Sequence, residues 1–147
     1  MNQIKIYKIF VGYLILAIIN GYFFNFINDT FFHFTNPEFD KLSEKETFFL
    51  TVIIAPIIET LILQVLIYKI LLHVGIKNDY ICIGIMSLIF SQMHWYYWLY
   101  VVMTFVSGLI INSFYIRLVK LKNTTWAFLF TMSLHLSYNL YGFLFVK

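Results

Sequence analysis

Long apolar runs make up most of this 147-residue chain, and short polar segments separate them. A helix that spans the hydrocarbon core of a bilayer needs about 20 mainly apolar residues. With 61% hydrophobic and only 12% charged residues, the chain is too apolar for a soluble domain of this length. We therefore predict one integral-membrane domain over residues 1–147, an all-α polytopic bundle of about five transmembrane helices. The expected spans are Ile6–Ile27, Glu46–Val74, Tyr80–Tyr97, Leu99–Leu118 and Thr124–Val146.

Basic residues are distributed unevenly over the loops between these spans. One side of the membrane would carry Lys5, Lys8, Lys69, Lys77, Arg117, Lys120 and Lys122. The other side would carry Lys41, Lys45 and Lys147 together with Asp29, Glu38, Asp40, Glu44 and Glu46. Because cytoplasmic loops are enriched in Lys and Arg, we expect a multi-pass protein of the cell (inner) membrane, with a cytoplasmic N-terminus and an outside C-terminus. No small-residue cleavage site is clear after the first span, so we expect a retained signal anchor.

Charge and cysteine content narrow the classes of function. The net charge of +3 is too small to indicate nucleic-acid binding, and none is expected. The single cysteine, Cys82, allows neither an internal disulfide nor a thiolate metal cluster. We interpret Cys82 as a small apolar residue of the third span.

Three ionisable residues interrupt the predicted spans: Glu59 in the second, His94 near the end of the third and His135 in the fifth. Ionisable side chains cost several kcal/mol inside hydrocarbon, so their default interpretation is functional. Asn139 follows His135 by four residues, which places the two on one helix face, one turn apart. At a rise of 1.5 Å per residue, the three ionisable residues lie about 15 to 22 Å from charged residues on one membrane side. They can therefore reach a common layer and form one site.

Each of these residues also has a simpler interpretation. His94 stands beside aromatic residues and is typical of an interfacial or hydrogen-bonded histidine. His135 and Asn139 could serve as polar contacts to a neighbouring helix. Glu59 could relay protons in a small proton-coupled transporter, although the sequence shows no repeated halves of the kind that many transporters have.

Short motifs around these residues resemble those of a known family. "FSQMH" (Phe90–His94) fits the pattern F-x-x-x-H, and "HLSYN" (His135–Asn139) fits H-x-x-x-N. "ETLILQ" (Glu59–Gln64), preceded by Pro56, stands where the family has E-E-x-x-x-R. In this order, one motif to a helix, they resemble the CAAX protease and bacteriocin-processing (CPBP or Abi) family of intramembrane proteases.

The resemblance covers the chain from about Thr47 to the C-terminus and leaves the first span outside. The third family motif is rich in small residues, and "FVSGLIINSFY" with Ser107 and Gly108 is its counterpart here. The first motif departs from the pattern, because Thr60 replaces the second acid and Gln64 replaces the arginine. Since both charges are lost together, no uncompensated buried charge remains. We expect Thr60 and Gln64 to hydrogen-bond across their shared turn.

The resemblance implies an intramembrane endopeptidase that hydrolyses a peptide bond of a membrane-associated peptide or protein. Glu59 would be the general base that activates a water, and His94 would share or hold that water. His135 and Asn139 would donate to the developing oxyanion. The other motif residues, expected to support the site or contact the substrate, are Thr60, Gln64 and Phe90.

Several alternatives stay open at this point. No cofactor is expected, but one Glu and two His are the ligand set of some catalytic zinc sites, so a metalloprotease is the rival within the enzyme class. The altered first motif favours another alternative, a non-catalytic family member that binds a partner as an immunity or scaffolding protein. Expected partners are the lipid bilayer, the membrane-associated substrate and a second copy of the chain, since about five spans are few to enclose a site.

Overall fold

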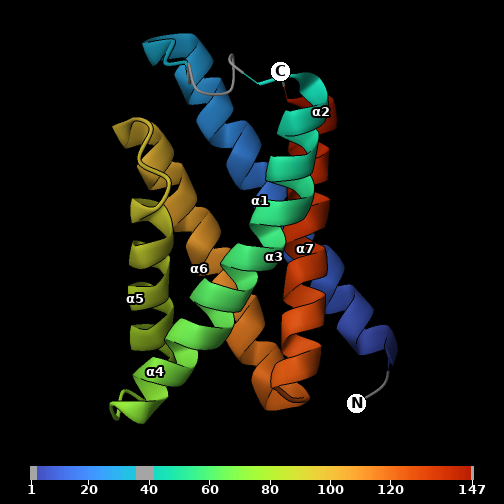
Figure 1. Ribbon diagram of the computed structural model, residues 1–147, viewed down its shortest axis with the longest axis vertical. Helices are drawn as coiled ribbons and strands as arrows, with labels where there is room; N and C mark the ends of the chain where they lie inside the picture. The colour runs from blue at the N-terminus through green and yellow to red at the C-terminus, as the bar shows by residue number, and fades with distance from the viewer. Residues whose placement is uncertain (1–2, 36–41, 147) are drawn as a thin grey trace.

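The computed structural model describes residues 3–35 and 42–146, and the regular elements in these ranges are all helical (Figure 1). This confirms the predicted all-α membrane bundle. Three helices are long and apolar enough to cross a membrane, over Ile6–Phe32, Glu44–His73 and Trp98–Leu121. Of the predicted loop charges, Glu38, Asp40 and Lys41 lie outside the described residues, as does Lys147 at the C-terminus.

Helices of both α and π type make up the bundle. α1 (Gln3–Ile27) continues into the π-helical turn η1 (Asn28–Phe32). The next rod, Glu44–His73, is built from α2 (Glu44–Thr47), η3 (Phe48–Ile54), α3 (Ala55–Glu59), η4 (Thr60–Leu66) and α4 (Ile67–His73). The last three helices are α5 (Asp79–Gln92), α6 (Trp98–Leu121) and α7 (Thr124–Phe145).

Local sequence signals set the ends of these helices. Ser43 and Glu46 form a reciprocal capping box at the start of α2. Asn78 and Asn123 cap α5 and α7 by accepting hydrogen bonds from backbone N–H groups of the first turn. The Glu44–His73 rod stops just before Gly75, whose φ of 89° is a left-handed conformation that glycine adopts without steric cost.

The Glu44–His73 rod bends at α3, between its two π-helical stretches. Figure 1 shows it running beside α7 from α2 and then turning away from α7 toward the start of α5. In η3 the backbone N–H groups donate to the carbonyl five residues earlier, as the hydrogen bond from the Ala55 N–H to the Leu50 carbonyl shows. Pro56 comes next in this register and has no N–H, so the Thr51 carbonyl loses its helical donor. Proline and π-helical turns are both recognised causes of helix bends.

The chain alternates between the two ends of the bundle (Figure 1). The N-terminus, the turn between α4 and α5 and the turn between α6 and α7 lie at one end, and the turn between α5 and α6 and the C-terminus lie at the other. At the first end, Asp79 and Lys120 form an ion pair that ties the start of α5 to the last turns of α6. The turns that the distribution of basic residues assigns to one side of the membrane therefore lie at one end of the bundle.

The third predicted helix is shorter than expected. We predict Tyr80–Tyr97 from the sequence, but α5 ends at Gln92 and a turn connects it to α6. In this turn the His94 N–H donates to the Ser91 carbonyl and the Tyr96 N–H to the His94 carbonyl. The two tryptophans near this turn are exposed, Trp95 at 66% and Trp98 at 51%, as is typical of interfacial residues. His94 therefore lies in a turn rather than within a helix.

Close packing joins α5, α6 and α7 into the core that carries the site. A Cβ atom at Gly108 would meet the Ser87 Cα at 3.0 Å, so glycine lets the backbones of α6 and α5 approach. Cys82 is a free cysteine and fully buried in this core. Tyr68 and Tyr115 pack edge to face across the core with ring centroids 5.8 Å apart.

Candidate active site

The Glu59 carboxylate faces two imidazoles that come from different parts of the chain. Oε1 lies 3.6 Å from His94 Nε2, and Oε2 lies 3.7 Å from His135 Nε2. Glu59 is the last residue of α3, His94 lies in the turn after α5, and His135 is in the middle of α7. These distances exceed a direct hydrogen bond but keep all three groups within reach of one small reactant. The structure thus brings together the three ionisable residues that the sequence singles out.

His94 is held by two contacts with Phe90. Its Nδ1 lies 2.7 Å from the Phe90 carbonyl oxygen, which can only accept, so Nδ1 carries the proton. In the neutral ring Nε2 then has a free lone pair, and this atom faces Glu59. The Phe90 ring lies against the imidazole with centroids 4.6 Å apart, and the centroid of His135 is 6.0 Å away on another side. Phe90 therefore supports both histidines.

His135 is deeper than His94, with only 3% of its surface exposed. Its Nε2 faces Glu59, whereas its Nδ1 has no hydrogen-bond partner among the described residues. A buried donor without a partner costs about 1–3 kcal/mol, so the arrangement favours the tautomer with the proton on Nε2. In that tautomer His135 presents a donor to the Glu59 Oε2 atom.

Asn139 has a structural task that the sequence does not reveal. Its Nδ2 donates a 2.7 Å hydrogen bond to the Thr51 carbonyl, which is the group that Pro56 leaves without a helical donor. Asn139 thereby caps the bent part of the Glu44–His73 rod from α7. The second N–H of the amide is left for another acceptor.

A cavity of about 600 Å³ opens beside the three residues Glu59, His94 and Asn139, which form part of its wall. His135 does not line this cavity and lies behind Glu59. The rest of the wall is mainly apolar and aromatic, and is formed by Leu42, Thr47, Leu50, Thr51, Ala55, Tyr96, Tyr100, Tyr138, Gly142, Phe143 and Val146. A mainly apolar cleft with a few convergent polar groups is the usual form of a ligand site.

The predicted hydrogen bond between Thr60 and Gln64 is wrong. Gln64 Nε2 instead donates to Asn112 Oδ1 at 2.9 Å, and Asn112 Nδ2 donates to Ser87 Oγ at 3.1 Å. These three side chains are fully buried and connect η4, α6 and α5. Thr60 is also fully buried, and its Oγ1 has no partner among the described residues.

Asn112 is a residue that our sequence analysis missed. It lies four residues after Gly108, inside the segment "FVSGLIINSFY", and a carboxamide in an apolar span signals a helix–helix hydrogen bond. The aromatic cavity residues Tyr100 and Tyr138 were also missed, because nothing in the sequence separates them from the many other tyrosines of the chain.

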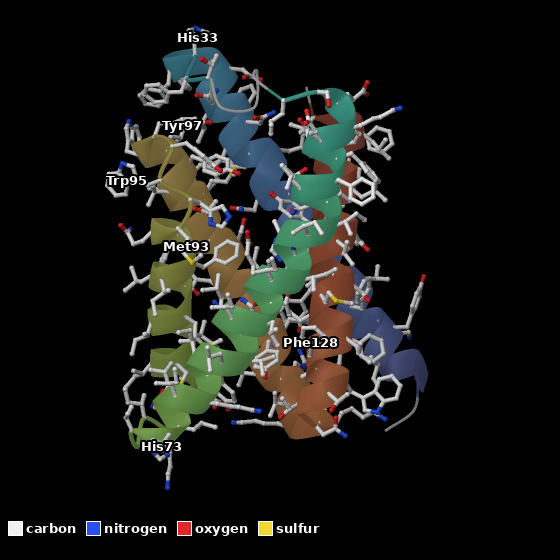
Figure 2. All side chains as sticks on the ribbon, viewed as in Figure 1. His33, His73, Met93, Trp95, Tyr97 and Phe128 are labelled. Carbon is white, nitrogen blue, oxygen red and sulfur yellow. The ribbon has the colours of Figure 1, made fainter. Side chains whose placement is uncertain are left out.

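The other two histidines take no part in this site. Figure 2 shows His33 and His73 at opposite ends of the molecule.

Within residues 3–35 and 42–146, no group of three or more His, Cys, Asp or Glu side chains has the arrangement of a metal site.

Comparison of the sequence with known proteins shows which family the chain belongs to. The family model for type II CAAX prenyl endopeptidases of the Rce1-like kind matches residues 45–141. The match includes Glu59, His94, His135 and Asn139 and leaves out α1. No curated protein and no solved structure matches the chain. The family match confirms the resemblance drawn from the short motifs, and the chain belongs to the Rce1-like family of type II CAAX prenyl endopeptidases.

Proposed function

We propose that this membrane protein is an intramembrane endopeptidase in which Glu59 activates a water to hydrolyse a peptide bond of a membrane-associated peptide or protein. The family supports a CAAX-type endopeptidase in general. The observation that carries the mechanism is the Glu59 carboxylate, set between two imidazole Nε2 atoms at the wall of a cavity of about 600 Å³.

In the proposed reaction a water lies beside Glu59 Oε1 and His94 Nε2 in the cavity. Both atoms accept hydrogen bonds, because His94 keeps its ring proton on Nδ1. The water then donates both hydrogens to the protein and directs a lone pair of its oxygen at the substrate carbonyl. Glu59 takes a proton as the C–O bond forms and returns it to the leaving amine as the C–N bond breaks.

The remaining polar residues stabilise charge in this scheme. Asn139 keeps one N–H on the Thr51 carbonyl and offers the other to the oxyanion of the tetrahedral intermediate. The sequence also predicts an oxyanion role for His135, but its place behind the carboxylate supports a different one. We assign His135 to orienting Glu59, because its Nε2–H faces Oε2 at 3.7 Å and leaves the other carboxylate oxygen for the water.

No metal takes part in this proposal. The two imidazoles and the carboxylate could serve as zinc ligands only if Glu59 gave up its role as base.

The binding or immunity alternative rests on the neutral Thr60 and Gln64. In the structure Gln64 Nε2 donates to Asn112, and Gln64 Oε1 has no hydrogen-bond partner among the described residues, so no hydrogen bond joins this amide to Glu59. The carboxylate still faces its two histidines in the presence of the neutral pair, which supports catalysis over simple binding.

The test is to reconstitute the protein in lipid vesicles with a library of membrane-tethered peptides in ¹⁸O-labelled water. We expect new peptide termini, with ¹⁸O in the new carboxyl group because water attacks the carbonyl directly. Peptides that bind and stay intact would contradict the proposal and favour the non-catalytic alternative.

A further inference from the structure

A second cavity of about 150 Å³ lies between α1 and the pair formed by α6 and α7. α1 provides one wall with Ile18, Gly21, Tyr22, Phe24, Asn25 and Asn28. The opposite wall comes from the start of α6 and the last turns of α7. Since the family match begins at residue 45, this cavity depends on a helix outside the matched region.

Specific contacts hold α1 against the other two helices. Asn20 Nδ2 donates to the Met103 carbonyl at 3.1 Å and to Ser107 Oγ at 2.9 Å. A Cβ atom at Gly21 would come within 3.0 Å of the Tyr138 hydroxyl oxygen, so the missing side chain makes room for Tyr138. α1 is therefore a fixed wall and not a loosely attached anchor.

The second cavity adjoins the large cavity that contains Glu59. Both are lined by Tyr100, Tyr138, Gly142 and Val146. The two cavities therefore lie on either side of these residues, which places the second cavity next to a substrate chain that occupies the large cavity.

Size and chemistry define what the second cavity can take. A cavity of about 150 Å³ holds a group of the size of benzene, which corresponds to one ring or one branched aliphatic side chain and excludes a long lipid chain. Its wall is mainly apolar and aromatic. Asn28 uses its amide on the backbone of Phe34, whereas the Asn25 amide makes no hydrogen bond with the described residues. An unused carboxamide at the edge of an apolar pocket suits the backbone of an extended peptide.

We propose that the cavity between α1 and the α6–α7 pair is a specificity pocket that binds one large apolar side chain of the substrate next to the cleaved bond. Asn25 binds the peptide backbone beside that side chain. The proposal rests on the proposed endopeptidase function and adds to it a determinant of sequence preference contributed by α1.

The test compares two tryptophan substitutions at neighbouring positions of α1. Ile18→Trp fills the cavity, while Ile19→Trp is the matched control because Ile19 is 57% exposed on the outer face of α1. Each variant receives pairs of membrane-tethered peptides that differ by Ala or Leu at one position near the cleaved bond. The readout is the ratio of the two cleavage rates, which does not depend on how much protein is folded.

For the wild type and Ile19→Trp we expect a preference for Leu of about tenfold or more at one position, since pockets discriminate methylene groups by about 10–200-fold. In Ile18→Trp the ratio should fall toward one, and Asn25→Leu should slow all peptides without changing the ratio. An unchanged Leu preference in Ile18→Trp would overturn the pocket assignment while cleavage itself continues. Absence of cleavage by the wild type would instead refute the endopeptidase function, and the pocket with it.

Discussion

The Asn139 side chain donates a 2.7 Å hydrogen bond to the Thr51 carbonyl, across the interface between α7 and the Glu44–His73 rod. Pro56, three residues before Glu59, leaves this carbonyl without a helical donor. Asn139, in the last motif of the chain, supplies the missing donor at the bend. The first motif, which contains Glu59, and the last, which contains Asn139, are therefore connected in two ways. Asn139 hydrogen-bonds the backbone of the rod that carries Glu59, and both residues line the large cavity.

Replacing Asn139 should destabilise the protein through this carbonyl. Asn139→Leu leaves a partly buried acceptor without its donor, which costs about 1 kcal/mol. Pro56→Ala supplies a backbone N–H for the same carbonyl, so it should restore most of that stability in the double variant. Thermal unfolding in detergent measures both effects.

The same pair of variants separates the two tasks of Asn139. Stability should return in the double variant, but peptide cleavage should not, because the oxyanion donor is still absent. Strictly additive effects of Pro56→Ala and Asn139→Leu on stability would show that the two residues do not share the Thr51 carbonyl.

The buried amides Gln64 and Asn112 should behave as one unit. Each single change, Gln64→Leu or Asn112→Leu, leaves the partner amide unsatisfied at a cost of about 1–3 kcal/mol. The double variant should lose less than the sum of the two, since both polar groups are removed together. A double-mutant cycle by thermal unfolding gives the coupling, and a coupling near zero would rule out the connection between η4 and α6.

Metal removal should leave the activity intact. Treatment of the reconstituted protein with a strong chelator, followed by exhaustive dialysis, is expected to change the cleavage rate by less than twofold, because Glu59 acts as the base on a water without a metal. Loss of cleavage that zinc restores would support the metalloprotease alternative instead.

The orientation in the membrane can be tested with single cysteines in a Cys82→Ser background. Lys45 and Lys77 are both exposed and belong to opposite ends of the bundle. With a cytoplasmic N-terminus, a membrane-impermeant maleimide should label Lys45→Cys in intact cells and Lys77→Cys only after permeabilisation. The reverse pattern would invert the topology.

The sequence predicts this fold and the meeting of Glu59, His94 and His135 because both depend on strong, local signals. Long apolar runs force a membrane bundle, and an ionisable residue inside such a run needs a partner. Spacing along the helices then brings the three side chains to one depth.

The features that the sequence does not predict depend on contacts between helices. The end of α5 at Gln92 is not marked by Pro, Gly or charge, since the aromatic residues of the turn are as apolar as those of a helix. The partner of Gln64 depends on which face of α6 meets η4. The role of Asn139 depends on the π-helical register before Pro56, and no residue pattern indicates that register.

Glu59→Gln is the most direct test of the proposed mechanism, because it keeps the size of the side chain and removes the base. Glu44→Gln, an exposed acid in the same rod, is the matched control. With equal amounts of folded protein in vesicles, Glu59→Gln should slow cleavage of a tethered peptide by about 10²–10⁴-fold, whereas Glu44→Gln should cleave at the wild-type rate. Cleavage by Glu59→Gln at a rate close to that of Glu44→Gln would contradict the assignment of Glu59 as the catalytic base.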